Sequence, residues 1–149
     1  MADSRAAQVL FHGARFSAPP ALTDTSVLSF VDHVGTPSLS LTVAQERLSG
    51  GAPALTVYVD EQQRAAQKAV PGYAMVARTE RSVGGAAALL VEGSAPSPGK
   101  KRRVLQLYVL DAPHERVFVV TATAAEAEVA RARAVVEHVA TGFTLEGSK

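Results

Sequence analysis

Residues 103–111, Arg-Val-Leu-Gln-Leu-Tyr-Val-Leu-Asp, and residues 116–123, Arg-Val-Phe-Val-Val-Thr-Ala-Thr, decide the fold. β-Branched and aromatic residues dominate both runs, and a proline lies among the four residues between them, so the two runs predict a β-hairpin. Apolar side chains fall on both of its faces, because Leu107 and Tyr108 are neighbours in the first strand. An antiparallel sheet with one wet face alternates apolar and polar residues, so this pattern predicts a sheet covered on both faces.

Two amphipathic helices are predicted outside the hairpin. Apolar residues recur at helical spacing from Pro53 to about Val70, where Pro71-Gly72 follows. Residues 123–126, Thr-Ala-Ala-Glu, have capping-box spacing and precede a second apolar stripe that stops at Gly142. We expect both helices to pack on one face of the sheet. Its other apolar face would then be met by another subunit, an apolar ligand or a partner protein.

Shorter runs predict the remaining strands. These are a bulged strand or short hairpin within residues 7–16, strands over 26–32 and 38–43, and a second hairpin over 73–92, joined near Ser82 or at Gly84-Gly85. In the run 38–43, Leu39 and Leu41 face one way while the serines and threonine face the other. The sequence thus predicts an α+β fold for residues 1–149 as a single domain, with an antiparallel sheet of about six or seven strands and two helices packed on one face.

Composition excludes several classes of function. The 149 residues are 47% hydrophobic and 19% charged with a net charge of +1, so no basic excess suggests a nucleic-acid partner. No cysteine is present, which removes disulfides, thiol catalysis and cysteine-held metals. No run approaches the roughly 20 apolar residues of a membrane span, and the first residues do not resemble a cleaved signal peptide. We therefore expect a cytoplasmic protein without direct membrane insertion.

Motifs for chemistry are missing from the sequence. The four histidines are far apart and none has metal-ligand spacing, so no metal site is predicted. The glycine pairs lack the strand-to-helix setting of a phosphate loop, and no serine has nucleophile-elbow surroundings. The basic run 100–103 could touch phosphates or an acidic partner, but its Pro/Gly/Ser setting favours a solvated loop tip. We predict neither a cofactor nor an enzyme.

Several short strings along the chain match a known pattern. They are residues 16–19, 22–27, 58–62, 70–73, 83–87, 106–109, 117–124 and 142–143. As a set they resemble the DcrB-related family, whose fold is similar to that of PsbP and Mog1 proteins. One departure is Leu22, where the family often has tryptophan.

Within that family, short members without a signal peptide resemble the Eag-type chaperones of type VI secretion. The resemblance implies a homodimeric cytoplasmic chaperone or adaptor that shields the N-terminal transmembrane helices of a secreted effector, often of the PAAR or Rhs type, in an apolar groove. Ser38, Ser40, Thr42 and Gln106 would offer hydrogen bonds to that client. The predicted groove residues are Leu39, Leu41, Gln106, Leu107, Tyr108, Phe118 and Val120.

Two other functions stay open. The first is an envelope-associated structural or binding protein of the DcrB or PsbP kind, whose second face is buried by a stable partner. The second, which the sequence supports least, is an enzyme or small-ligand carrier. A closed pocket with a converging histidine and carboxylate would favour that class.

Overall fold

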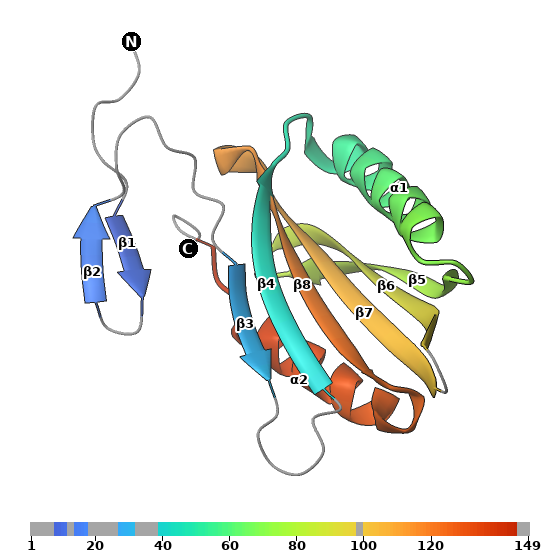
Figure 1. The fold of residues 1–149 in the computed structure, drawn as a ribbon. Coiled ribbons are helices and arrows are strands. Elements are labelled where there is room, and N and C mark those ends of the chain that lie inside the picture. The colour runs from blue at the N-terminus through green and yellow to red at the C-terminus, as the bar shows by residue number, and fades with distance from the viewer. Residues whose placement is uncertain (1–7, 12–13, 18–26, 32–38, 98–99, 146–149) are drawn as a thin grey trace.

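The structure is a computed structural model that describes residues 8–11, 14–17, 27–31, 39–97 and 100–145. Figure 1 shows a curved sheet with one helix in front of it and one behind. In chain order the described elements are β1 (Gln8–Phe11), β2 (Ala14–Ser17), β3 (Val27–Val31), β4 (Leu39–Arg47), α1 (Gly51–Ala69), β5 (Ala74–Val83), β6 (Ala86–Ser97), β7 (Lys100–Asp111), β8 (Arg116–Ala125) and α2 (Val129–Gly142).

Six of these strands form one antiparallel sheet in the order β3-β4-β8-β7-β6-β5. The hairpin predicted from residues 103–111 and 116–123 is confirmed as β7 and β8, and it lies in the middle of the sheet. A short 3₁₀ turn at Ala112–His114 joins the two strands. β1 and β2 pair separately as a two-stranded sheet. The predicted α+β class, an antiparallel sheet with two helices, is therefore confirmed.

The two helices lie on opposite faces of the sheet, so the expectation that both pack on one face is wrong. Leu107 belongs to a buried cluster with Val136 of α2, whereas its neighbour Tyr108 belongs to a second cluster with Val59 of α1. Successive residues of a strand point to opposite faces. Both faces of the hairpin are apolar because a helix of the same chain packs on each of them.

At two places the chain pairs as a β-strand where the local sequence predicts another structure. Thr123 was expected to cap a helix, but it lies inside β8 opposite Ser40 and Val104, and α2 begins only at Val129. The basic run 100–103 was expected to be a solvated loop tip, but it forms the start of β7 and pairs with β6. Each ladder pairing adds hydrogen bonds with a neighbouring strand, which a single cap cannot match.

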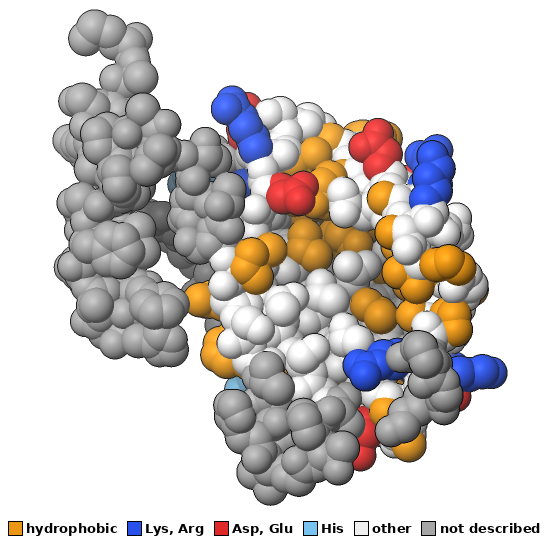
Figure 2. Space-filling model, viewed as in Figure 1, with side chains coloured by type: hydrophobic (Ala, Val, Ile, Leu, Met, Phe, Trp, Pro, Cys, Tyr) orange, Lys and Arg blue, Asp and Glu red, His pale blue; other side chains and the backbone are white. Residues whose placement is uncertain are grey.

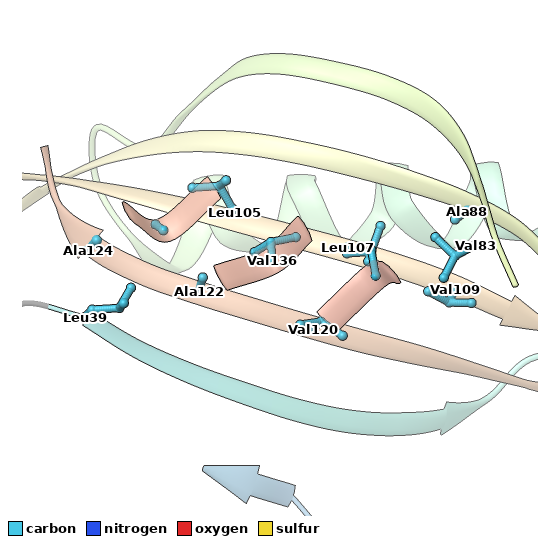
Figure 3. Packing of buried hydrophobic residues seen from close by; sticks show 12 residues of the cluster. Leu39, Val83, Ala88, Leu105, Leu107, Val109, Val120, Ala122, Ala124 and Val136 are labelled. Atoms are coloured by element: carbon cyan, nitrogen blue, oxygen red, sulfur yellow. The ribbon is translucent and has the colours of Figure 1, made fainter. Parts of the chain in front are cut away.

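The larger cluster, called the α2 cluster here, is the main hydrophobic core. Figure 3 shows Val136 pointing from α2 onto the sheet, among side chains that include Leu107 and Ala122. Leu107 and Ala122 have no exposed surface, and Val136 has 1%. The helix stripe predicted before Gly142 is confirmed at its centre. The helix contributes the buried residues Ala132, Val136 and Ala140.

Neither helix spans the full width of the sheet. α1 lies over β6 and β7, whereas α2 lies over β7 and β8. On the α1 face, β4 and most of β8 therefore have no helix in front of them in Figure 1. This uncovered part of the sheet is therefore a candidate binding surface.

Candidate functional site

Hydroxyl and amide side chains line the uncovered part of the α1 face. Thr42, Thr121 and Gln106 lie side by side in one row across β4, β8 and β7. Ser40 and Thr123 form the next row. All five are partly exposed, and Figure 2 shows few hydrophobic side chains over the lower parts of β4 and β8. We call this surface the open floor: Ser40, Thr42, Gln106, Thr121 and Thr123.

A polar network anchors the floor to α1. Gln63 of α1, which is 6% exposed, donates from Nε2 to Oε1 of Gln106 over 3.1 Å and to the Tyr108 hydroxyl over 3.3 Å. The Tyr73 hydroxyl donates to Gln63 Oε1 over 2.7 Å. Gln106 in turn reaches the Thr121 hydroxyl at 3.5 Å. Because buried polar groups cost stability when unpaired, this network holds Gln106 in one position at the edge of the floor.

The tyrosines of this face are kept neutral by burial. Burial raises the pKa of Tyr108 to about 12, and it also raises the pKa of Tyr73. The pKa of Tyr58 is raised by burial and then by its hydrogen bond to Glu46, whose Oε2 accepts from the hydroxyl over 2.7 Å. All three hydroxyls therefore remain hydrogen-bond donors at physiological pH.

α1 forms a wall beside the open floor. Tyr58 reaches Glu46 of β4, so its side of the helix faces the uncovered strands. Gln62, Ala65 and Ala69 follow Tyr58 at helical spacing on the same side. Alanines four residues apart leave room for another backbone to approach closely. The surface thus combines a floor of hydroxyl and amide groups with a wall that ends in two small side chains, Ala65 and Ala69.

Of the seven predicted groove residues, Gln106 lies on the open floor. Leu39, Leu107 and Val120 are buried in the α2 cluster, and Tyr108 is buried under α1. The expected exposure of these four residues is therefore wrong, because helices of the same chain cover both faces at those positions. Leu41 and Phe118 are partly buried against the α2 cluster.

Of the four hydroxyl and amide residues expected to bind a client, three lie on the open floor. Ser40, Thr42 and Gln106 share this face. Ser38 lies outside the described residues. Thr121 and Thr123 were missed, although the strand period reveals them. Val120 and Ala122 are core residues, so the residues between and beyond them face the other way.

A histidine and a carboxylate converge elsewhere, at the end of the sheet. His114 Nδ1 lies 3.0 Å from Asp111 Oδ2, and the same oxygen accepts a 2.7 Å hydrogen bond from Arg116 Nε. Burial opposes ionisation of Asp111, but these two partners outweigh it and lower its pKa. Asp111 and His114 line a cavity of about 470 Å³ whose other lining residues are glycines, alanines, leucines and a proline. These lining residues include no nucleophilic side chain. We therefore interpret the pair as a contact that stabilises the β7–β8 turn.

Two features are absent from the part of the chain that the structure describes. Among the residues that the structure describes, no three histidine or acidic side chains are placed to hold a metal ion. His12 and His33 lie outside those residues. Within the same part of the chain, neither helix has the length and apolar character needed to cross a bilayer. That the protein is not an enzyme stays a prediction.

The fold is similar to that of other solved structures. A Pseudomonas aeruginosa protein of unknown function, PA94, described as a candidate regulator, is 21% identical with a TM-score of 0.79. The match covers 96% of this chain and 99% of that one. LpqN of Mycobacterium tuberculosis, described as involved in cell envelope biogenesis, is 24% identical with a TM-score of 0.54, over 70% of this chain and 60% of that one. Both likenesses show the fold. A search of curated proteins finds no match.

The fold and the open floor define an α+β protein with an exposed polar sheet surface beside a helix. The DcrB family model matches residues 14–141, so the chain belongs to the DcrB family. This confirms the family resemblance read from the sequence. The likeness to Eag-type chaperones and to PsbP and Mog1 proteins stays a prediction.

Proposed function

We propose that the protein is a cytoplasmic chaperone or adaptor of the Eag type. It binds the N-terminal transmembrane helices of a type VI secretion effector of the PAAR or Rhs type and shields them from water. The observation that carries this proposal is the open floor: five hydroxyl and amide residues in two cross-strand rows, next to the alanine-bearing side of α1.

The chemistry of this surface suits a membrane helix better than a soluble one. Helices in membranes pack through small residues and through hydrogen bonds from serine, threonine and glutamine side chains. Ser40, Thr42 and Thr121 offer the same groups on a sheet, and Ala65 of α1 offers a small contact. The apolar residues around them, including Val119 and Val104, are partly buried and supply the remaining contact surface.

The proposal does not depend on an uncovered apolar face of the sheet. The sheet has no wholly uncovered apolar face, because each helix covers part of one side. A client would instead lie along the strands, over the floor and against α1, in the helix-in-groove manner. Its apolar surface then leaves water, while its own polar groups meet hydroxyls that can donate or accept.

We propose further that two copies of the chain pair through the β3 edge. β3 is an edge strand of the sheet, and it carries three half-exposed apolar side chains: Val27 at 57%, Leu28 at 43% and Phe30 at 51%. An exposed apolar edge strand readily pairs with a second chain. Light scattering on the purified protein should give the mass of a dimer, and Phe30→Lys should shift it to the monomer.

Co-expression with a client tests the chaperone function. The N-terminal fragment of a PAAR or Rhs effector encoded beside this gene should be soluble and co-purify with the chain. Thr42→Arg and Thr121→Arg place a charge on the open floor and should abolish the complex. Thr79→Arg is the matched control, because Thr79 is an exposed strand threonine on the opposite face. A client that stays soluble with both floor variants would rule this function out.

The second candidate is an envelope-associated structural or binding protein. Membership of the DcrB family and the fold shared with LpqN, which is described as involved in cell envelope biogenesis, favour it. In that case a stable envelope partner would occupy the open floor. Fractionation of cells that produce the native gene product separates the two functions, since this candidate requires the protein in the envelope fraction.

A further inference from the structure

The α1 face carries charges of opposite sign beyond the two ends of the open floor. Glu46 of β4 pairs with Val117 at one end of β8, and Arg102 of β7 pairs with Ala125 at the other. Paired residues share a face, and the alternation along β4 and β7 places both charged residues on the α1 face. Both are exposed.

Between these charges the α1 face is uncharged. The three intervening rows on β4, β8 and β7 contain alanine, valine, tyrosine, serine, threonine and glutamine. The open floor occupies the two rows nearer Arg102, and Tyr108 in the third row is buried under α1. Among the described residues Arg102 forms no ion pair, whereas its neighbour Arg103 points to the other face and pairs with Glu126. Glu46 accepts a hydrogen bond from the Tyr58 hydroxyl. The floor is therefore polarised along the strands, with its acidic end at Glu46 and its basic end at Arg102.

The distance between the two charged residues matches one membrane-spanning helix. Their partners on β8, Val117 and Ala125, are eight residues apart. Val117 itself is buried in the cluster under α1, so the exposed surface at this end belongs to β4. At a rise of about 3.3 Å per residue, the separation is about 26 Å. About 18 residues of α-helix cover the same distance, close to the roughly 20 that cross a bilayer core.

We infer that the open floor holds one apolar client helix in a single direction. The N-terminal end of the helix lies at Glu46 and its C-terminal end lies at Arg102. A helix carries partial positive charge at its N-terminus and partial negative charge at its C-terminus, so this direction is attractive at both ends and the reverse is repulsive at both. The inference rests on the proposed function and adds the client's length and direction.

Cysteine cross-linking reads the direction, since the chain contains no cysteine of its own. Ala44→Cys marks the Glu46 end and Thr123→Cys marks the Arg102 end. The probe is a helix of about 20 leucine, alanine and serine residues with uncharged flanks, fused to maltose-binding protein and carrying one cysteine at either end. Ala44→Cys should cross-link the N-terminal cysteine at least about threefold more than the C-terminal one, and Thr123→Cys should show the opposite preference.

Neutral variants test the cause of that preference. Glu46→Gln with Arg102→Gln keeps the acceptor for Tyr58 and removes both charges, so the preference should fall to about even while the complex persists. Equal or reversed cross-linking in the charged protein, with the probe still bound, would overturn the direction and leave the chaperone function standing. If neither this probe nor the neighbouring effector fragment forms a soluble complex, both proposals fail.

Discussion

Gln63 of α1 and Gln106 of β7 are joined side chain to side chain, with Gln63 Nε2 donating to Gln106 Oε1 over 3.1 Å. The two residues are 43 positions apart, so this bond fixes the helix on the sheet at the border of the open floor. Its neighbours Tyr73 and Tyr108 bond to the same glutamine. One hydrogen-bond network therefore joins the open floor to α1, the helix that covers the rest of this face.

Removing Gln63 should destabilise the protein. Gln63→Ala leaves the Tyr73 hydroxyl without its acceptor and Gln106 without one of its donors in a buried setting, which costs about 2 kcal/mol. Urea unfolding of the two proteins measures this difference. Gln67→Ala, an exposed glutamine on the same helix, is the control and should change the free energy of unfolding by less than about 0.5 kcal/mol. Equal effects would mean that the network does not stabilise the fold.

Gly93 makes room for Tyr73. A methyl group at Gly93 would lie 2.2 Å from the Tyr73 hydroxyl and 2.5 Å from its ring, so Gly93→Ala must displace the tyrosine and break its bond to Gln63. We expect a loss of about 2 kcal/mol in unfolding free energy. Gly142→Ala meets nothing within 4 Å and should be close to neutral.

A double-mutant cycle tests the cause of the Gly93 effect. In a Tyr73→Ala background the ring is absent, so adding Gly93→Ala should cost much less than it does in the native protein. An unchanged cost would locate the effect in the strand itself, because alanine and glycine also differ in backbone freedom.

The sequence predicted the central hairpin and the alternation of residues 39–43 because both depend on local spacing. It did not predict which face each helix covers. Leu107 and Tyr108 are both large and mainly apolar, so the pattern predicts that both faces are covered. It does not predict which helix packs on which face. The floor residues Thr121 and Thr123 were hidden for a similar reason. A threonine in a strand is ordinary until the core face of that strand is known.

Asp111 should make stability depend on pH in the acid range. Its pKa in the folded protein is lowered, so its contribution is fully present above its unfolded pKa of about 3.9 and is lost as pH falls through the lower folded value. Asp111→Asn should therefore lower the free energy of unfolding by about 2 kcal/mol at neutral pH, with a shrinking difference below about pH 4. Urea titrations at several pH values measure it. A difference that stays constant from pH 7 to pH 3 would contradict this role.

Charge placed on the two faces of the same hairpin should have opposite consequences for folding and for binding. Leu107 has no exposed surface and lies in the α2 cluster, so Leu107→Asp buries a charge and should unfold the protein. Thr121→Asp is a matched change on β8, on the partly exposed α1 face, and should leave the thermal midpoint within a few degrees of the native value. The same variant should lose the soluble complex with the effector fragment, because its carboxylate would lie under the apolar client. Circular dichroism and co-purification check the two parts.

If Thr121→Asp stays folded and keeps the client, the open floor is not the binding surface. If Leu107→Asp folds normally, the assignment of the two faces is wrong.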